Sequence, residues 1–320
     1  MAWKTTLPPK RGLTVLEMME GIETGRIKAM VIMGENPLLS DPDIAHVKEA
    51  LKKLEFLVVQ DIFITETGEL ADVVLPGATF AEKDGTFTNT ERRVQRVRQA
   101  FPPPGESRPD WQIIQDLSTA IGYEMYYTHP GKVMDEIASL TPIYGGIDYE
   151  RIEENGLQWP CLDYEHPGTP VLHVGRFPKG KARFLPVEFI PPAESVSQKY
   201  PYILTTGRML FHFHTGTMTR RSQGLNQVCP RAYVEINAED ARALSLRNGD
   251  EIRVTSRRGS IELEARVTDR ISKGVVFIPF HFKEAAANLL TVSQYDPVAK
   301  IPEYKVCAVK IEPIEIRGEK

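Results

Sequence analysis

The chain contains few cysteines. Its three, Cys161, Cys229 and Cys307, lie far apart in the sequence, and no C-x-x-C pair occurs. A structural zinc site, a cysteine-ligated iron-sulfur cluster and a disulfide framework all need thiols that are more closely spaced or more numerous. The sequence therefore excludes these kinds of site within the chain and predicts reduced, partly buried thiols in a cytoplasmic protein. For Cys161, beside Pro160, a role as metal ligand or nucleophile is the alternative.

Long apolar runs and an excess of positive charge are also missing. No segment approaches the roughly 18 apolar residues of a membrane span, and residues 1–12 have neither an apolar core nor a cleavage site. The 39 Lys and Arg against 43 Asp and Glu give a net charge of −4, which excludes the global basic field of non-specific nucleic-acid binding. With 320 residues, 42% of them hydrophobic, the chain can build a buried core, and two domains are expected.

Helical and strand patterns alternate over residues 1–145, which predicts an α/β domain. Thr14 can cap a first helix with apolar residues on one face, and Gly25 can stop it. Further helices are expected at 43–54, 110–121 and 132–140, and short apolar strands at 30–33, 56–59 and 72–75. Strands of this kind predict a parallel sheet that is buried on both faces and binds ligands at its carboxyl ends.

Polar residues follow these strands where each one ends. Gly34 would let the backbone approach a ligand closely. Glu35, Asn36 and Asp61 offer donors and acceptors that can read a purine edge. For each residue alone, an ordinary turn after a strand is an equally good interpretation, but their coincidence at one sheet edge favours a ligand site.

The segment 82–98 is rich in turn residues, hydroxyls and arginines. Gly85 and Asn89 mark turns. Four guanidinium groups follow, those of Arg92, Arg93, Arg96 and Arg98. Such a loop suits a diphosphate or an acidic protein surface, because guanidinium groups bind both. A solvated charged strand is the alternative.

Residues 146–195 are rich in Gly, Pro and isolated aromatics, and we interpret them as a connecting region. The remainder, 196–320, alternates apolar and polar residues with period two. Strands are expected at 202–206, 251–255, 261–267, 275–279 and 306–311, with a hairpin turn at Arg258-Gly259. A compact β domain hides its edges best by closing into a barrel.

A long polar loop, 205–222, leaves the first strand of this β domain. Gly207 frees its backbone, and Arg208 and Arg220 are donors suited to phosphate. His212 and His214 are spaced like one face of a strand. Hydrogen bonding to an organic ligand is favoured over a metal pair, because no third ligand is near in the sequence.

The segment 274–313 places a dense series of polar groups between two apolar strands. They are His281, Asn288, Thr291, Asp296, Lys300 and Lys305. Because buried polar groups must find partners, this concentration indicates a loop held against a bound polar ligand. A solvated connection with incidental charge is the alternative.

Twelve motifs follow one another along nearly the whole chain. They are I-M-G-E-N-P, V-V-Q-D-I-F, A-D-V-V-L-P, G-T-F-T-N-T-E-R-R-V-Q, D-W-Q-I-I, Q-W-P-C, T-G-R, H-T-G-T-M-T-R-R-S, N-A-E-D-A, R-R-G-S-I, A-N-L-L-T and D-P-V-A-K-I-P-E-Y-K. In content and order they resemble the C-terminal half of the catalytic subunit of molybdopterin-dependent formate dehydrogenases, within the dimethyl-sulfoxide-reductase family. The closing N-x-L-T, D-P and P-E-Y-K series favours the formate branch over the nitrate branch.

The resemblance implies a Rossmann-like parallel-sheet domain followed by a C-terminal double-psi β-barrel, and a bis-molybdopterin-guanine-dinucleotide cofactor holding molybdenum or tungsten. It implies a set of cofactor-binding residues: Gly34, Glu35, Asn36, Gln60, Asp61, Gly85, Thr86, Arg208, His214, Thr215, His281, Asn288 and Lys305. Arg, Lys and backbone N–H groups can meet the diphosphates, while a carboxylate such as Asp61 reads the guanine N–H groups. No catalytic residue and no metal ligand are expected in this chain.

Family members carry further motifs upstream of the matching region. These are a cysteine cluster for an iron-sulfur centre, a selenocysteine or cysteine that ligates the metal, an adjacent histidine and a substrate-facing arginine. They do not occur in this sequence. The chain is therefore expected to be one piece of a split or truncated enzyme that oxidises formate to carbon dioxide or runs the reverse reaction, and to be inactive alone.

The expected partners are an N-terminal segment or chain that carries the cluster and the metal ligand and shares the cofactor, and an iron-sulfur electron-transfer subunit. Neither nucleic acid nor a direct membrane span is expected. The alternatives are a non-catalytic molybdopterin-binding or carrier subunit, and a family member that acts on nitrate or another oxyanion.

Overall fold

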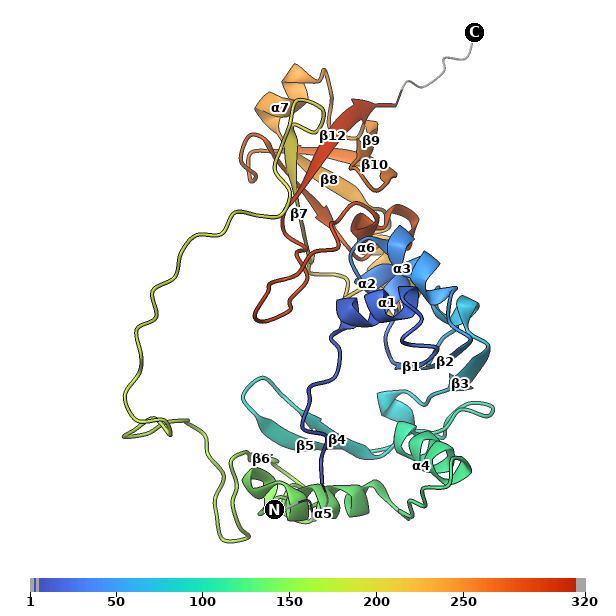
Figure 1. The fold of residues 1–320 in the computed structure, drawn as a ribbon, viewed down its shortest axis with the longest axis vertical. Coiled ribbons are helices and arrows are strands. Elements are labelled where there is room, and N and C mark those ends of the chain that lie inside the picture. The colour runs from blue at the N-terminus through green and yellow to red at the C-terminus, as the bar shows by residue number, and fades with distance from the viewer. Residues whose placement is uncertain (1–2, 4–5, 315–320) are drawn as a thin grey trace. The chain divides into compact units, whose positions relative to one another are not determined.

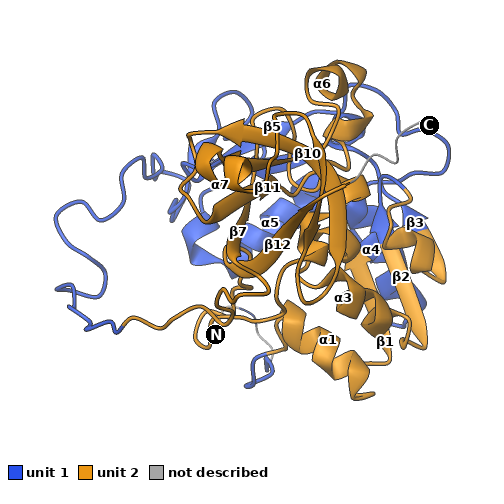
Figure 2. Ribbon diagram, turned by 90° about the horizontal axis from the view of Figure 1, so that it is seen from above, with its two compact units in different colours: residues 1–11, 60–63, 75–188 blue, residues 12–59, 64–74, 189–320 orange. Residues whose placement is uncertain are grey.

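The computed structural model describes residue 3 and residues 6–314, and the chain divides into two compact units. Unit 1 comprises residues 1–11, 60–63 and 75–188, and unit 2 comprises residues 12–59, 64–74 and 189–320 (Figure 2). The strands β2 (Phe56–Asp61) and β3 (Val73–Pro76) each begin in unit 2 and end in unit 1. Figure 1 shows the elements in chain order.

The N-terminal part of unit 2 packs helices against strands. Its elements are α1 (Val15–Glu23), β1 (Ala29–Met33), α2 (Pro37–Ser40) and α3 (Ile44–Leu51). As predicted, Thr14 begins α1: its N–H and its hydroxyl both bond to the Glu17 carboxylate, each at 2.9 Å. The apolar face of α1 joins a core with α3 and β2, in which Met19, Val47 and Val59 are buried.

The strands β1, β2 and β3 form a three-stranded sheet in that order. Residues 57–60 of the central strand β2 are buried. The strand β1 is not buried in the same way: Ile32 is buried, but Val31 is 63% exposed and Met33 is 50% exposed. The prediction of a sheet buried on both faces is therefore wrong for β1, because the face of this strand that carries Val31 and Met33 is uncovered.

Unit 1 contains a small sheet and two helices. They are β4 (Gly85–Thr88), β5 (Arg93–Val97), β6 (Leu157–Gln158), α4 (Asp110–Ala120) and α5 (Pro130–Leu140). Val94, Met134, Ile147, Ile152 and Cys161 form its buried core. The segment 82–98, predicted as a polar loop, is thus mostly an antiparallel hairpin of β4 and β5.

The C-terminal part of unit 2 is a closed six-stranded barrel in the order β10-β8-β11-β7-β12-β9. Its elements are β7 (Tyr202–Gly207), α6 (Gln223–Val228), β8 (Tyr233–Asn237), α7 (Ala238–Ala243), β9 (Glu251–Thr255), β10 (Ser260–Thr268), β11 (Val275–Pro279) and β12 (Cys307–Pro313). Two strand pairs are parallel, β10 with β8 and β11 with β7. The predicted α/β fold with a C-terminal barrel is confirmed, as is the hairpin between β9 and β10.

The connection before the barrel is irregular over residues 171–200 and exposes apolar side chains, Phe184 among them. It is fixed to the barrel at Glu194, which is buried and pairs with Arg257 and Arg258. None of the helices in the described part of the chain combines the length and the apolar character needed to cross a membrane.

Candidate functional site

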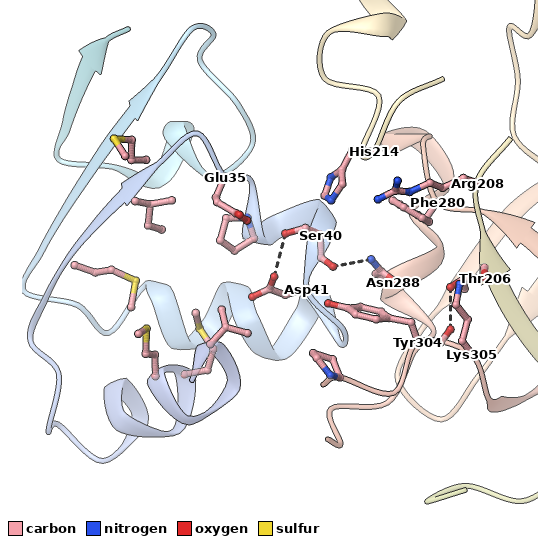
Figure 3. A pocket seen from close by; sticks show the side chains of 18 of the residues that line it. Glu35, Ser40, Asp41, Thr206, Arg208, His214, Phe280, Asn288, Tyr304 and Lys305 are labelled. Atoms are coloured by element: carbon pink, nitrogen blue, oxygen red, sulfur yellow. Dashed lines mark hydrogen bonds between the residues drawn. The ribbon is translucent and has the colours of Figure 1, made fainter. Parts of the chain in front are cut away.

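The main cavity of unit 2 has a volume of about 710 Å³ (Figure 3). One wall comes from α1, β1 and α2, and the other from the barrel and the loop before β12. The polar residues that line it are Glu35, Ser40, Asp41, Thr206, Arg208, His214, Asn288, Tyr304 and Lys305. Residues about 170 to 270 positions apart in the sequence therefore face one space of the size that small-molecule ligands occupy.

Two carboxylates stand on the wall formed by β1 and α2. Glu35 follows Gly34, whose φ of +64° turns the chain out of β1 in a conformation that favours glycine. Asp41 is only 5% exposed, and its Oδ1 accepts a hydrogen bond from Ser40 Oγ at 3.0 Å. Its Oδ2 is buried and has no hydrogen-bond partner among the described residues. Burial, together with the charge of Glu35, raises the pKa of Asp41 to about 6.

The barrel wall carries two cations. The Arg208 guanidinium lies over the rings of Phe213 and Phe280, 5.9 and 6.0 Å from their centroids. Lys305 Nζ donates to the Thr206 carbonyl at 2.6 Å, and Thr206 Oγ1 donates to the Tyr304 carbonyl at 2.8 Å. These bonds fix the start of the last barrel segment beside β7, so a cation stands at the edge of the cavity.

Asn288 joins the two walls. Its side chain is buried, and Nδ2 donates to the carbonyls of Leu39 at 2.9 Å and Ser40 at 3.0 Å, at the end of α2 (Figure 3 draws the bond to Ser40). Both amide protons are therefore used on backbone. Asn288 positions Ser40 and hence Asp41, and its two bonds hold the end of α2 against the loop that follows β11.

His281 and Thr215 lie at a smaller pocket of about 220 Å³ in the same unit. His281 is fully buried: Nε2 accepts the Met209 N–H at 2.9 Å, and Nδ1 donates to the His214 carbonyl. Burial lowers the pKa of His281, which favours this neutral form. Gly216 follows with φ +75°, and a Cβ there would lie 2.4 Å from the His281 carbonyl oxygen. The two bonds of His281 hold the loop from Met209 to Gly216 against the barrel, and the absence of a side chain at Gly216 allows the close approach.

Asn36 and His212 are also bonded within the protein. The buried Asn36 donates to Glu66 at 2.8 Å and accepts from the N–H and the hydroxyl of Thr67. His212 is buried between the Cys229 carbonyl at 2.8 Å and the Thr219 hydroxyl at 3.2 Å. In the described residues, no group of three or more His, Cys, Asp or Glu side chains is arranged to hold a metal ion.

Unit 1 brings together a second set of predicted site residues. Gln60 is buried and donates to Asp110 Oδ1 at 2.8 Å, and Lys83 Nζ contacts Asp110 Oδ2. Asp61 follows in the chain, with Oδ1 accepting from the Ile62 N–H at 2.7 Å. Gly85 lines a pocket of about 300 Å³ whose other lining residues include Lys83, Thr86, Asp110 and Trp111.

The four arginines of the hairpin β4–β5 bind within unit 1. Arg92 donates to the carbonyls of Thr169 and Pro170, and Arg93 pairs with Glu91. Arg96 and Arg98 pair with Glu153, each at 2.8 Å. The alternative of a charged strand therefore describes this segment better than a loop open to a diphosphate.

Sequence reasoning missed several polar residues of these pockets, among them Asp41, Lys83 and Asp110. Lys83 lies in the segment 82–98, two residues before Gly85, and Asp110 begins the motif D-W-Q-I-I. Asp41 ends the run P-L-L-S-D in the connection between α2 and α3, and a charged residue that closes a mainly apolar run is a usable signal. Of the thirteen predicted site residues, five line the main cavity, two the smaller pocket and two the pocket of unit 1. Asn36, Gln60 and Asp61 are bonded within the protein, and Gly34 lines none of these three pockets.

Two family models match the chain. Residues 4–120 match molybdopterin oxidoreductase, and residues 202–308 match the molydopterin dinucleotide binding domain. A solved structure with a similar fold is the acetylene hydratase from Pelobacter acetylenicus. Its TM-score is 0.73 over 93% of this chain and 46% of that chain, and at 18% identity the likeness shows the fold alone.

Curated relatives match almost the whole length of this chain. The F420-dependent formate dehydrogenase subunit alpha of Methanocaldococcus jannaschii is 54% identical over 98% of this chain and 47% of its own length. The F420-dependent formate dehydrogenase 1 subunit alpha of Methanococcus maripaludis is 48% identical over the same shares. A probable oxidoreductase of Bacillus subtilis is 43% identical over 99% of this chain and 32% of its own length. The chain spans about half the length of these formate dehydrogenase subunits.

Proposed function

Because this chain belongs to the molybdopterin oxidoreductases, we propose that it is the cofactor-binding part of a molybdenum or tungsten formate dehydrogenase. The observation that carries the proposal is the 54% identity along 98% of the chain to a subunit named for that activity. We further propose that the cofactor is the bis-molybdopterin guanine dinucleotide form, shared with a partner segment or chain.

The donor and acceptor chemistry of the main cavity fits part of such a dinucleotide. Arg208 and Lys305 bring positive charge, which a diphosphate needs. Asp41 on the opposite wall has a buried Oδ2 without a partner, and an N–H-bearing ring would supply one. A cavity with cations on one wall and an unsatisfied acceptor on the other suits a ligand with an anionic part and a hydrogen-donating ring.

In unit 1, Lys83 and Asp110 offer the same two kinds of group at the pocket that Gly85 lines, and Asp61 follows Gln60, which bonds to Asp110. We assign this pocket to another portion of the cofactor. Asp61 and Asp110 would accept from ring N–H groups, and Lys83 would meet an anionic oxygen. Gly85 presents backbone without a side chain, so a ligand can approach it closely.

The residues of this chain bind, orient and shield the cofactor. When bound, the metal centre accepts the two electrons that formate loses on becoming carbon dioxide and a proton. We assign the metal ligand and an iron-sulfur cluster to the partner segment or chain, and the onward electron path to an iron-sulfur subunit. The three cysteines are free and buried, which fits the reducing cytoplasm that we propose as the location.

The test is to purify the chain from its host together with whatever co-purifies. Metal content, pterin fluorescence and formate oxidation are measured on the same fractions, with a viologen dye and F420 as acceptors. We expect metal, pterin and formate oxidation in the complex, and no oxidation by the isolated chain.

Two results would contradict the proposal in different ways. Robust formate oxidation by the isolated chain would overturn the assignment of the metal ligand to a partner. A complex that holds metal and pterin but reduces nitrate, or oxidises nothing, would replace formate dehydrogenase by one of the alternative functions.

A further inference from the structure

We infer that Asp41 selects the ligand of the main cavity by accepting hydrogen bonds from the aminated ring edge that guanine and pterin share. On this edge an exocyclic amine adjoins a ring nitrogen that carries hydrogen. The inference rests on the proposed function and adds to it the residue that discriminates between ring systems.

The state of the Asp41 carboxylate is the first argument. It lines the cavity, is 5% exposed, and has one oxygen bonded to Ser40 while the other is buried without a partner (Figure 3). An acceptor removed from water and left unbonded is unfavourable, so this oxygen calls for a partner, which a ligand in the cavity can supply. Oδ2 is therefore an acceptor that a donor on a ligand would complete.

The shape of the acceptor is the second argument. A carboxylate has two oxygens in one plane and donates nothing when it is ionised. Each oxygen can accept more than one hydrogen bond, so the bond from Ser40 leaves Oδ1 able to accept again. Two acceptors side by side match two parallel N–H donors, which guanine and pterin present and which the analogues without the exocyclic amine lack.

The apolar lining beside Asp41 is the third argument. Met18, Met19, Met30 and Met33 line the same cavity, from α1 and β1. Thioethers are polarizable and make favourable contacts with aromatic rings. A flat heteroaromatic ring could thus lie against these methionines while its edge meets Asp41.

The surroundings of Asp41 determine the pH range in which its carboxylate is ionised. Glu35, His214, Tyr304, Arg208 and Lys305 line the same cavity. Burial and the Glu35 charge together hold the pKa of Asp41 at about 6, against the hydrogen bond from Ser40, which lowers it. Above that pH the carboxylate is ionised and accepts two bonds, and below it the added proton blocks one of them. Ligand selection is therefore expected to weaken in mild acid.

The test uses the full chain and two matched pairs of ligands. GMP is compared with IMP, which lacks the exocyclic amine, and neopterin with the lumazine that bears the same side chain. Dissociation constants are measured by calorimetry, or by ligand fluorescence for the pteridines. We expect the wild type to prefer the aminated member of at least one pair by about tenfold or more, and Asp41→Asn to reduce that preference to about twofold or less. The pair that responds identifies the ring as guanine or pterin.

The matched control is Asp269→Asn, on an exposed bend of the barrel, which should leave the preference unchanged. Thermal unfolding verifies that each variant is folded. An Asp41→Asn preference equal to that of the wild type would overturn the inference alone. Failure of the wild type to bind any of the four ligands would overturn the proposed function as well, and a wild-type preference unchanged between about pH 5 and pH 8 would also contradict the role of Asp41.

Discussion

Asp41 combines a charge with a nearly complete loss of water contact. Burial raises its pKa from 3.8 to about 6, so the folded state holds this proton more tightly than the unfolded state does. The resulting stabilisation is fully present below about pH 4 and is lost as the pH rises through 6. At neutral pH, the ionised carboxylate therefore lowers the stability of the free protein.

Replacing Asp41 by Asn should consequently stabilise the ligand-free chain at high pH. The shift of about two pKa units corresponds to a gain on the order of 3 kcal/mol in the free energy of unfolding at about pH 8. Little change is expected at about pH 4. Urea unfolding at the two pH values measures both. Equal destabilisation at both would mean that Asp41 carries a structural bond that the amide cannot replace.

The reactivity of each cysteine is a second property that depends on the surroundings of a single residue. All three cysteines are free and buried, and burial raises the pKa of Cys307 to about 12. Because the thiolate is the reactive form, Cys307 should resist alkylation by a maleimide at about pH 8 in the native chain and react fully in urea. Peptide mass spectrometry after labelling locates the modified residue. Rapid native labelling of Cys307 would show that β12 opens readily.

The residue types of the site could be predicted from the sequence, but their environments could not. Glu35, Arg208 and Lys305 follow strands or lie in polar loops, and all three line the main cavity. His281 and Asn36 were chosen for the same reason, yet both are buried and bonded within the protein. Whether a polar group meets a ligand or a carbonyl depends on segments up to about 250 positions away, which a local pattern does not contain.

At the scale of elements, α1 owes its start to the bonds between Thr14 and Glu17. Thr14→Ala removes one of them, and we expect the free energy of unfolding to fall by about 1 kcal/mol. Chemical denaturation measures this loss. The control is Thr24→Ala at the exposed end of α1, where the hydroxyl bonds only to helix carbonyls and a smaller loss is expected. Equal losses would indicate that the cap contributes nothing specific.

Elements with strong periodic patterns were predicted, and those that depend on distant partners were not. The strands β7, β9, β10, β11 and β12 all lie close to their expected positions. The strand β8 was missed because Tyr233, Val234 and Ile236 are buried, which breaks the alternation of period two. Its conformation comes from pairing with β10 and β11. The hairpin β4–β5 was missed although its pairing is local, because its strands are polar and only Val94 is buried, so the apolar alternation of a strand is absent.

At the scale of the whole chain, unit 2 is built from both ends of the sequence. The domain boundaries at 145 and 196 remain a proposal, and limited proteolysis tests them. Trypsin should cut first at Lys179, Lys181 or Arg183, in the exposed irregular connection. We expect the two fragments to elute together in size-exclusion chromatography, because the bonds from Asn288 to Leu39 and Ser40 hold them.

A second elution in urea completes this experiment. Urea should separate the two fragments, which confirms that the connection was cut. Separate elution without urea would favour independent domains at 1–145 and 196–320. In that case the wall carrying Asp41 and the wall carrying Arg208 would belong to different folding units.

The two hydrogen bonds of Asn288 also determine when, during synthesis of the chain, the main cavity can form. A ribosome makes residues 15–41 before residues 206–305, and the main cavity needs both. While the chain is being made, the wall with Asp41 exists without Asn288 and without Arg208 or Lys305. No complete binding place is present until synthesis has passed Lys305, so a ligand of this cavity can be loaded only after this residue has been made. This order of loading is thus a consequence of where the two walls lie in the gene.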